Sequence, residues 1–420
     1  MNTYDLAVRR EAVFGKGTYL FYEEPVNVVR GEGVHLFDAD GKRYLDMYNN
    51  VPCVGHCNPH VVEAMHRQAS TLNVHSRYLH EGVVEYSERL LAKHHESLEH
   101  IVFACTGTEA NEIAVTMARQ FTGGRGLICS DRGYHGNTAE LGKLTFAGVK
   151  EDPEIRPIKF PEKYRPLKEG ASEAELTELH LAQVQEAIDS FAAADVPFAG
   201  MLICSIFANE GLPDIPAGFM ERATQLVHDA GGVMIADEVQ AGFCRVGTFW
   251  GYETTGFVPD IVTMGKPMGN GVPLSACVAR EEIVTAFRRT GYFSTFAATP
   301  LQAAAGAAVL DVIEKEGLLE SAAAVGARLR EGLSKIEHPC IGDLRGHGLF
   351  IGVEWVSDRD NKTPDHAGAK RVVNRLKEKG YMLSNAGAFA NTLKVRPPLV
   401  FTDAHADEFL GVFEETVREF

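Results

Sequence analysis

Short apolar runs alternate with helix-like stretches through the middle of the chain. The apolar runs are HIVFACT (100–106), GLICSD (126–131), AGMLICSIF (199–207), GVMIADEV (232–239) and DIVTMGK (260–266), and helix-like stretches include 109–121, 174–193 and 217–230. Near-continuous hydrophobic runs are typical of strands that are covered on both faces. The alternation therefore predicts an α/β fold with a mostly parallel central sheet and helices on both of its sides.

The pattern changes from about residue 301, where an alanine-rich helix leads into a second unit. That unit contains helix-like stretches at 319–336 and 366–379, strand-like runs GLFIGVEWV and TLKVR, and a final helix with Asp403 as its expected N-cap. Residues 26–47 look like hairpins with Asp-Gly turn chemistry. We expect three parts, namely an N-terminal arm (1–55) that joins the small domain, a large domain (56–305) and a C-terminal small domain (306–420).

Composition narrows the class of protein. The chain has 420 residues with 57 acidic against 41 basic side chains, a formal charge of −16, which argues against nucleic-acid or anionic-membrane partners. It has no uncharged apolar run of about 18 residues and no signal-peptide core. Its eight cysteines are scattered, and several lie in apolar runs, as expected of reduced thiols. We expect a cytoplasmic protein.

The segment CTGTEANE lies between a predicted strand and a predicted helix. Thr106, Gly107 and Thr108 would present backbone N–H groups and hydroxyls at the helix N-terminus, which is a favourable phosphate site. Ordinary helix capping by threonine is the alternative interpretation.

Two charged residues end neighbouring predicted strands. Asp237 follows a buried run, so its carboxylate needs a cation or several donors, either an arginine in a salt bridge or the protonated nitrogen of a ligand ring. Lys266, in TMGKPMGNG, would become a nucleophilic amine if it is buried, although most lysines at strand ends extend to solvent. The glycines around Lys266 favour the reactive amine because they clear room for a ligand.

A fourth signal, RGYHG (132–136), also follows a strand-like run, and Tyr134 or His135 could stack on a flat ring. A phosphate site, a stacking ring, a buried aspartate and a pocket lysine together describe a flat phosphorylated aldehyde with a protonatable ring nitrogen. That combination predicts pyridoxal 5'-phosphate as the cofactor.

Two other segments contain residues that could form a metal site or a dinucleotide site. In CVGHCNPH, Cys53, His56, Cys57 and His60 have metal-like spacing, but no second pair lies at a standard zinc interval, so no metal is expected. GGRG (123–126) precedes a strand instead of following one, which argues against a dinucleotide site.

Nearly the whole chain resembles the class III (ω-type) aminotransferases, which are fold-type I pyridoxal-phosphate enzymes. The resemblance rests on GTEAN, YHG, IADEVQAGFCRVG, VPDIVTMGKPMGNG and RGHGLFIGVE. It implies a seven-stranded, mostly parallel central sheet and a smaller α+β domain. Within the class, YNNVPCVGHCNPH and SRYLHEGVVEYSERL are similar to a subgroup that holds alanine–glyoxylate-type aminotransferases and ethanolamine-phosphate phospho-lyases.

The resemblance also implies roles for individual residues. Lys266 would form the Schiff base and Asp237 would bind the pyridine nitrogen. Gly107 and Thr108 would bind the phosphate. Tyr134 and Val239 would cover the two ring faces, and Gln240 would contact the ring hydroxyl. Thr295 is similar to a residue that reaches the neighbouring subunit's phosphate, which implies a homodimer with shared active sites.

For the substrate, the resemblance implies that Arg396 binds a carboxylate and that Glu210 pairs with this arginine. Asn50 and Tyr78 are expected to help shape the substrate pocket. Because Arg396 is present, we expect transamination from an amino acid or ω-amine to a 2-keto acid (pyruvate, glyoxylate or 2-oxoglutarate). The alternatives are a lyase that expels a β- or γ-substituent such as phosphate, and a catalytically silent cofactor-binding protein.

Overall fold

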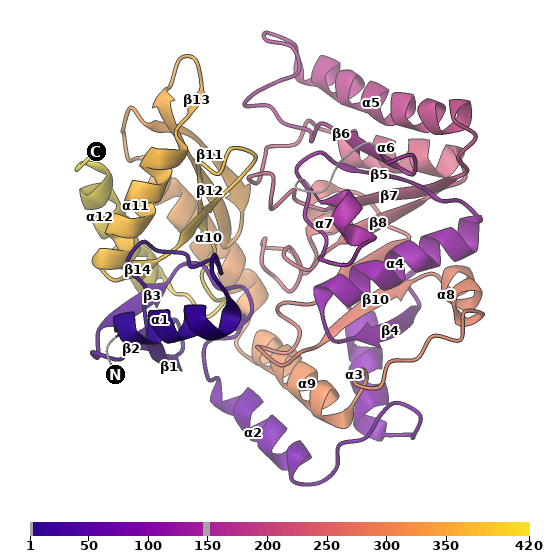
Figure 1. The fold of residues 1–420 in the computed structure, drawn as a ribbon, viewed down its shortest axis with the longest axis horizontal. Helices are drawn as coiled ribbons and strands as arrows, with labels where there is room; N and C mark the ends of the chain where they lie inside the picture. The colour runs from indigo at the N-terminus through magenta and orange to yellow at the C-terminus, as the bar shows by residue number, and fades with distance from the viewer. Residues whose placement is uncertain (1–2, 146–151) are drawn as a thin grey trace.

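The computed structural model describes residues 3–145 and 152–420, and its centre is a seven-stranded sheet (Figure 1). Its strands are β4 (His100–Ala104), β5 (Gly126–Ser130), β6 (Ile155–Ile158), β7 (Phe198–Cys204), β8 (Val233–Asp237), β9 (Ile261–Met264) and β10 (Ser275–Ala279), in the order β4-β10-β9-β8-β7-β5-β6. Only β10 runs antiparallel to its neighbours in this sheet. The predicted α/β fold with a mostly parallel sheet is confirmed.

Helices cover both faces of this sheet, as the continuous apolar runs predict. In β8, Met234 and Ala236 belong to one hydrophobic cluster, whereas Val233 and Ile235 belong to another on the opposite face. The second cluster includes α4 (Gly107–Thr122) and α8 (Glu281–Arg288), and the first includes α5 (Glu173–Ala193) and α6 (Phe219–Asp229). All five residues of β8 are buried, so a polar side chain at its end is held in a fixed position.

Two smaller sheets form the rest of the molecule. The first consists of β1 (Val28–Glu32), β2 (His35–Asp38), β3 (Arg43–Asp46) and β14 (Tyr381–Met382), and the second of β11 (Ile341–His347), β12 (Phe350–Asp358), β16 (Thr392–Val395) and β15 (Ser384–Ala386), with β13 (Thr363–Pro364) paired to β12. Since β14 pairs with β3, the N-terminal hairpins join the C-terminal unit, while the exact domain boundaries stay a prediction.

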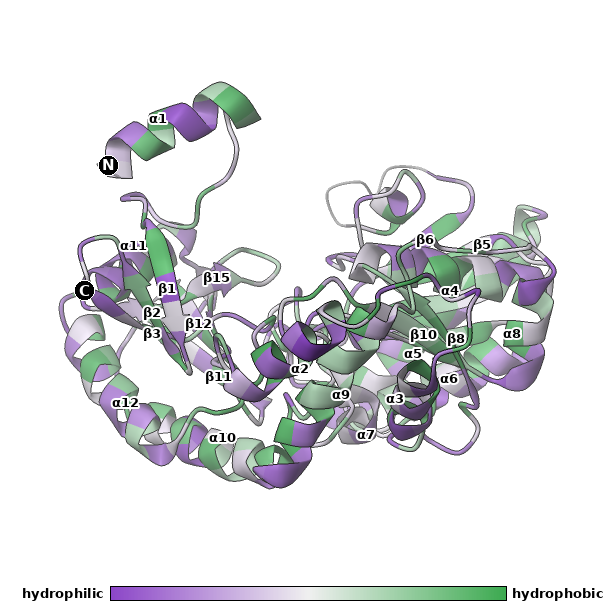
Figure 2. Cartoon of the chain, turned by 90° about the horizontal axis from the view of Figure 1, so that it is seen from below, coloured by the Kyte–Doolittle hydropathy of each residue, from purple (hydrophilic) through white to green (hydrophobic). Residues whose placement is uncertain are grey.

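The remaining helices lie mainly around these smaller sheets and beside the large one. They are α1 (Thr3–Phe14), α2 (Pro59–Ala69), α3 (Glu81–Leu91), α7 (Gly251–Thr255), α9 (Pro300–Lys315), α10 (Leu318–Ser334), α11 (His366–Glu378) and α12 (Asp403–Val417), with a 3-10 turn at Leu141–Leu144. The N-cap of α12 is Thr402, so Asp403 is the first helical residue and not the predicted cap. Helix α1 stands off the body of the molecule and has no buried residue (Figure 2).

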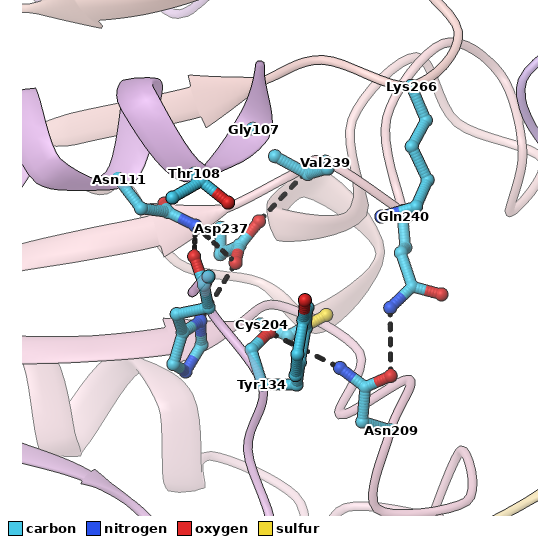
Figure 3. A pocket seen from close by; sticks show the side chains of 12 residues that line it. Gly107, Thr108, Asn111, Tyr134, Cys204, Asn209, Asp237, Val239, Gln240 and Lys266 are labelled. Carbon is cyan, nitrogen blue, oxygen red and sulfur yellow. Dashed lines mark hydrogen bonds and ion pairs between the residues drawn. The ribbon is translucent and has the colours of Figure 1, made fainter. Parts of the chain in front are cut away.

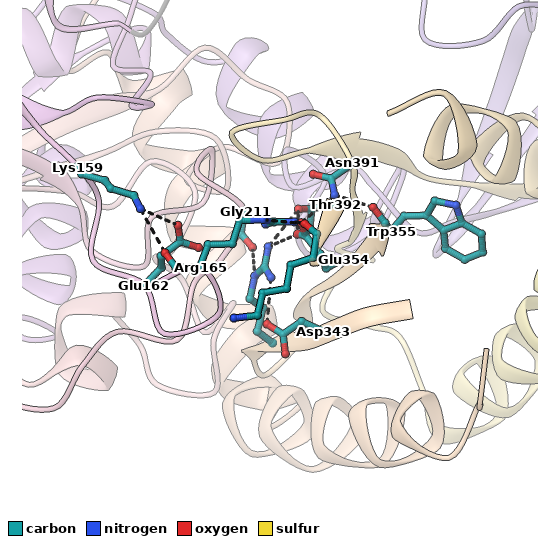
Figure 4. Close-up of polar contacts among 11 residues, drawn as sticks. Lys159, Glu162, Arg165, Gly211, Asp343, Glu354, Trp355, Asn391 and Thr392 are labelled. Atoms are coloured by element: carbon teal, nitrogen blue, oxygen red, sulfur yellow. Dashed lines mark hydrogen bonds and ion pairs between the residues drawn. The ribbon is translucent and has the colours of Figure 1, made fainter. Parts of the chain in front are cut away.

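A network of ion pairs connects the segment after β6 to the sheet that contains β11 and β12 (Figure 4). Arg165, in the segment after β6, contacts Oε1 of Glu354 on β12 at 2.6 Å, and Arg345 on β11 contacts the other oxygen of Glu354. Burial opposes ionisation of Glu354, but Arg345 and Arg165 outweigh it and lower its pKa. Arg165 therefore links the segment after β6 to the sheet that contains β11 and β12.

No helix in residues 3–145 and 152–420 is long and apolar enough to cross a membrane.

Candidate active site

A cavity of about 140 Å³ lies where β8 and β9 end and α4 begins (Figure 3). Its walls are Gly107, Thr108, Asn111, Tyr134, His135, Gly136, Cys204, Asn209, Asp237, Val239, Gln240 and Lys266. Strand ends at the carboxyl edge of a parallel sheet are the usual place for a ligand site in this architecture. The fold thus brings most of the predicted cofactor residues into one cavity.

Asp237 ends β8 and is surrounded by donors. Its Oδ2 accepts from Nδ2 of Asn111 at 2.9 Å and contacts Nδ1 of His135 at 2.8 Å, while Oδ1 accepts from the backbone N–H of Val239 at 3.0 Å. No lysine or arginine forms an ion pair with Asp237 within the described ranges, so the salt-bridge alternative is wrong. The amide of Asn111, the imidazole of His135 and a backbone N–H orient this carboxylate for a cationic ring nitrogen.

Lys266 follows β9 and its side chain lines the cavity. Burial, with a smaller contribution from the positive charge of Arg396, lowers the pKa of Lys266, and Asp237 opposes this effect. A lowered pKa makes the neutral, nucleophilic amine more abundant at neutral pH. The side chain does not extend to solvent, contrary to the alternative drawn from the sequence.

The glycines near Lys266 have different roles from the one expected. A Cβ on Gly269 would lie 2.5 Å from the carbonyl oxygen of Val272, and Gly271 has a positive φ of 114°. These two glycines allow a tight turn, and neither lines the cavity. A Cβ on Gly265 would lie 3.4 Å from the Cα of Gly107, which is an ordinary contact distance, so the end of β9 lies against the start of α4 without requiring a glycine there.

The N-terminus of α4 presents its first residues to the cavity. Thr106 is the N-cap, and its hydroxyl accepts from the backbone N–H of Glu109 at 3.1 Å, so capping occupies this side chain as the alternative predicts. Gly107 and Thr108 line the cavity. A Cβ on Gly107 would lie 2.9 Å from Cγ1 of Val239, so only glycine allows this packing. The free N–H groups of this helical turn suit a phosphate.

Gln240 is the centre of a polar cluster on the other side of the cavity. Its Oε1 accepts from Nη1 of Arg396 at 2.6 Å and from Nζ of Lys394 at 3.0 Å, and its Nε2 donates to Oδ1 of Asn209 at 3.0 Å. Nδ2 of Asn50 donates to the Gln240 backbone oxygen at 3.0 Å. Asn50 therefore supports the wall and does not line the cavity.

Arg396 and Lys394 are both 4% exposed. Neither forms an ion pair with a carboxylate in the described part of the chain, because Arg396 binds Gln240 and the backbone oxygen of Tyr48, and Lys394 binds Gln240 and the backbone oxygen of Ala208. Burial lowers the pKa of both side chains. An anionic ligand group beside Gln240 would favour the charged forms of both side chains, which have no anionic partner among the described residues.

The structure does not show the expected pairing of Glu210 with Arg396. Glu210 is buried, and neither of its carboxyl oxygens has a hydrogen-bond partner among the described residues. Nε of Arg396 donates to the backbone oxygen of Tyr48 and Nη1 donates to Gln240, and no ion pair joins Arg396 to Glu210 in the described part of the chain. The pairing stays a prediction.

Two further predicted residues lie outside this cavity. Tyr78 is 65% exposed, and Thr295 is exposed on the segment before α9. In a single chain, neither can contact a ligand in the cavity, so Tyr78 is not a wall residue here. Thr295 stays a prediction that depends on a second subunit.

Three of the four possible metal ligands, His56, His60 and Cys53, have other partners. Nε2 of His56 contacts Asp46 at 2.7 Å, Nε2 of His60 contacts Asp311 at 2.8 Å, and Sγ of Cys53 donates to the Pro267 backbone oxygen at 3.2 Å. These contacts hold α2 and the segment before it against the rest of the fold.

Sequence reasoning missed three polar residues around the cavity, namely Asn111, Asn209 and Lys394. Asn111 lies four residues after Gly107, so it lies on the same face of α4, and this spacing could have identified it. Lys394 lies two residues before Arg396 in an extended segment, where side chains at i and i+2 share a face. Asn209 lies in an irregular loop, and no periodic signal marks it.

Glu238, next to Asp237, gives a prediction about stability. It is fully buried, accepts from the backbone N–H groups of Gly251 and Tyr252 at 2.8 Å each, and contacts the Ser205 hydroxyl at 2.5 Å. Burial raises its pKa from 4.5 to about 7. The folded protein then binds this proton more tightly than the unfolded chain does, so the contribution to stability is full below pH 4.5 and is lost as pH rises through 7.

We expect Glu238→Gln to remove this pH dependence. Between pH 4.5 and pH 7.5 the wild-type protein should lose about 3 kcal/mol of unfolding free energy that the variant keeps, because one pKa unit corresponds to about 1.4 kcal/mol. Urea unfolding of both proteins at several pH values measures the difference. Parallel pH profiles would contradict the prediction.

The cavity fits pyridoxal 5'-phosphate at each of its functional groups. The start of α4 can hold the phosphate, Asp237 can bind the ring nitrogen, and Lys266 can bond to the aldehyde carbon. Val239 and Tyr134 lie beside the space for the ring. The bound cofactor would supply a ring that withdraws electrons from the substrate carbon next to the amine.

Comparison with known proteins agrees with this chemistry. The family model described as aminotransferase class-III matches residues 21–417. The alanine–glyoxylate aminotransferase 2-like protein of Drosophila melanogaster is 38% identical over 427 residues, which cover 97% of this chain and 85% of that protein.

Two solved structures are similar over almost their full length. A phospholyase from Arthrobacter in complex with phosphoethanolamine has a TM-score of 0.95 and 41% identity, and the match covers 99% of this chain and 100% of that one. The omega transaminase from Pseudomonas jessenii in complex with PMP has a TM-score of 0.88 and 25% identity, over 94% and 92% of the two chains. The chain therefore belongs to the class III aminotransferase family and is an enzyme that uses pyridoxal 5'-phosphate.

Proposed function

We propose that this enzyme eliminates phosphate from a small phosphorylated amine of the ethanolamine-phosphate type. The observation that carries the proposal is the pair of buried cations Lys394 and Arg396, which share only the neutral acceptor Gln240. A phosphate monoester carries more negative charge than a carboxylate, so it suits two cations better than one carboxylate does. The likeness to the Arthrobacter phospholyase supports the same substrate class.

In this reaction the enzyme's own groups would position the substrate and move one proton. Lys266, freed from the cofactor, would take a proton from the carbon that carries the amine. Arg396 and Lys394 would hold the phosphate as its C–O bond breaks on the neighbouring carbon. One water is consumed, and the products are phosphate, ammonia and an aldehyde, so no keto acid is needed.

Transamination is the second candidate, and it remains the reaction that the sequence alone favours. The Drosophila relative is named as an alanine–glyoxylate aminotransferase 2-like protein, which supports transamination. Arg396 could hold the carboxylate of a keto acid. This reaction requires pyruvate, glyoxylate or 2-oxoglutarate as acceptor and should follow ping-pong kinetics.

One assay separates the two reactions. The purified holoenzyme is incubated with ethanolamine phosphate in the absence of any keto acid, and phosphate and ammonia are both measured. Equal release of the two products supports elimination. Amino transfer from alanine or an ω-amine to a keto acid, without phosphate release from ethanolamine phosphate, would overturn the proposal in favour of transamination.

The buried cations give a further prediction. Arg396→Met and Lys394→Met are each expected to raise KM for the anionic substrate about 10- to 100-fold, because a charge-assisted hydrogen bond contributes about 1.5–3 kcal/mol. Arg289, an exposed residue that caps α8, provides the control, and Arg289→Met should leave KM unchanged. An unchanged KM in both Arg396→Met and Lys394→Met would contradict the role of these side chains.

We also propose that the enzyme is a homodimer and is cytoplasmic. Helix α1 buries none of its residues, and Leu79 and Phe296 are large apolar side chains on the surface of the single chain, as expected of an interface. All eight cysteines are unpaired, which suits a reducing compartment. Light scattering coupled to size exclusion tests the dimer, and a monomeric mass would refute it.

A further inference from the structure

A short piece of the N-terminal arm holds the turn that follows β9, next to the cavity lysine. Sγ of Cys53 donates to the backbone oxygen of Pro267 at 3.2 Å. The backbone N–H of Val54 donates to Oδ1 of Asn270 at 3.1 Å, and Nδ2 of Asn270 donates to the backbone oxygen of Gly55 at 2.9 Å. Three consecutive residues of the arm therefore contact this turn at both of its ends.

The side chain of Asn270 does more than allow the turn. Its φ angle is 48°, a left-handed conformation that asparagine adopts more readily than most residues. An asparagine needed only for this angle could leave its amide in solvent. Here the amide oxygen accepts and the amide nitrogen donates, and both partners lie 215 and 216 residues earlier in the chain, within residues 47–55, which we call the arm segment. The amide is therefore a long-range link between the turn and the arm segment.

The arm segment also holds Arg396, the proposed anion-binding residue. The backbone N–H of Arg396 donates to the Met47 backbone oxygen at 2.7 Å, and its Nε donates to the Tyr48 backbone oxygen at 3.0 Å. Nδ2 of Asn50 donates to the backbone oxygen of Gln240 in the cavity wall at 3.0 Å. One short segment thus contacts the turn after the lysine, the cavity wall and the arginine. It sets the separation between the lysine amine and the group that would bind the substrate anion.

We propose that Asn270 is a positioning residue that, through the arm segment, fixes Lys266 relative to Arg396 for proton transfer at the substrate carbon. A catalytic group that is misplaced by about 1 Å can lose about 10²-fold in rate, so two hydrogen bonds to the adjoining turn matter for the reaction. The proposal rests on the proton transfer proposed for Lys266. Elimination and transamination share this step, so the role of Asn270 is the same in both reactions.

Asn270→Gly tests this role, because glycine keeps the positive φ angle and removes only the side-chain amide. The kcat per bound cofactor is measured with ethanolamine phosphate, or with alanine and pyruvate if the enzyme transfers amino groups, using hydrogen or deuterium on the carbon that carries the amine. We expect kcat to fall about 10- to 100-fold and KM to change less than about threefold, because the arm segment still holds Arg396. The isotope effect on kcat should be at least as large as in the wild type. An unchanged kcat or a smaller isotope effect would overturn the proposal.

Hydrogen exchange of the holoenzyme provides a second measurement that does not depend on turnover. The backbone N–H groups of Met268, Asn270 and Val272 donate within the turn. We expect peptides that cover residues 266–272 to exchange about fivefold faster or more in Asn270→Gly, and peptides that cover β2 and β3 to exchange at the wild-type rate. Faster exchange in all peptides would mean a general loss of stability, and unchanged exchange in the turn would mean that the amide does not hold it. Either result would overturn the proposal.

Asp195 provides a matched control for the backbone conformation. It also has a positive φ angle, 54°, and it lies in the exposed turn between α5 and β7 and does not line the cavity. Asp195→Gly makes the same kind of substitution outside the arm segment and the turn after β9, so kcat, KM and the isotope effect should keep their wild-type values. If Asp195→Gly lowered kcat as much as Asn270→Gly does, the effect would come from a left-handed backbone alone and the proposal would fail.

Discussion

Replacing Lys266 with alanine is expected to abolish turnover, by about 10⁴-fold or more, and to remove the visible absorbance of the lysine-bound cofactor. The side chain lines the cavity, and burial lowers the pKa of its amine. It has two tasks, covalent attachment of the cofactor and proton transfer at the substrate carbon. General acid–base catalysis alone contributes about 10²- to 10⁴-fold, so losing both tasks should exceed that range.

Absorbance and kcat measured on the same samples check this result, with two other lysines as controls. Lys315 is exposed and pairs with Asp311, so Lys315→Ala should retain both absorbance and activity. Lys394 is a second buried amine nearby, and Lys394→Met should keep the absorbance even where it weakens substrate binding. A Lys266→Ala protein that keeps a lysine-bound cofactor would contradict the assignment.

The general position of this site could be predicted because it depends on a few strand ends. Asp237 and Lys266 follow consecutive apolar runs, and the carboxyl ends of parallel strands meet at one edge of a sheet. Their pairing places Asp237 opposite Thr263, three residues before Lys266. The same reasoning located Gly107 and Thr108, since α4 starts directly after β4 and the turn at Cys105 and Thr106.

What the sequence could not predict depends on side-chain direction and on loops without a repeating pattern. Glu210 lies in a loop where Phe207 and Leu212 have positive φ angles of 50° and 59°, so neither helical nor strand spacing tells where its side chain points. The role of Gly269 required the distance from its Cβ position to the Val272 carbonyl oxygen. The predicted contact of Thr295 with a phosphate requires a second chain, so it could not be judged from one sequence.

Lys394 changes which reaction we propose for this site. Arg396 alone resembles a carboxylate site and favours transamination. With Lys394 on the same face of the same extended segment, two basic side chains donate to Gln240, which lines the cavity, and neither has an acidic partner among the described residues. The second cation is what favours a phosphate over a carboxylate in the proposed function.

Replacing Asp237 with asparagine is expected to lower kcat by about 10²- to 10³-fold while the fold is retained. Asparagine has nearly the same shape, but it has no charge to bind a protonated ring nitrogen. Removing one partner of a buried charge pair costs about 3–5 kcal/mol, which corresponds to this range. Asn111 and His135 would then face a neutral amide, so the affinity for the cofactor should fall as well.

Asp260 provides a matched control at the opposite end of the same sheet. It is also a buried aspartate, it contacts Nε2 of His228 at 2.8 Å, and it accepts from the backbone N–H of Met234 at 2.7 Å, but it lies before β9 and away from the cavity. Asp260→Asn should lower the unfolding free energy and leave kcat per folded molecule unchanged, whereas Asp237→Asn should lower kcat and cofactor affinity. Equal kcat values for the two variants would mean that the charge of Asp237 does not act on the cofactor, and the ring-nitrogen role would have to be abandoned.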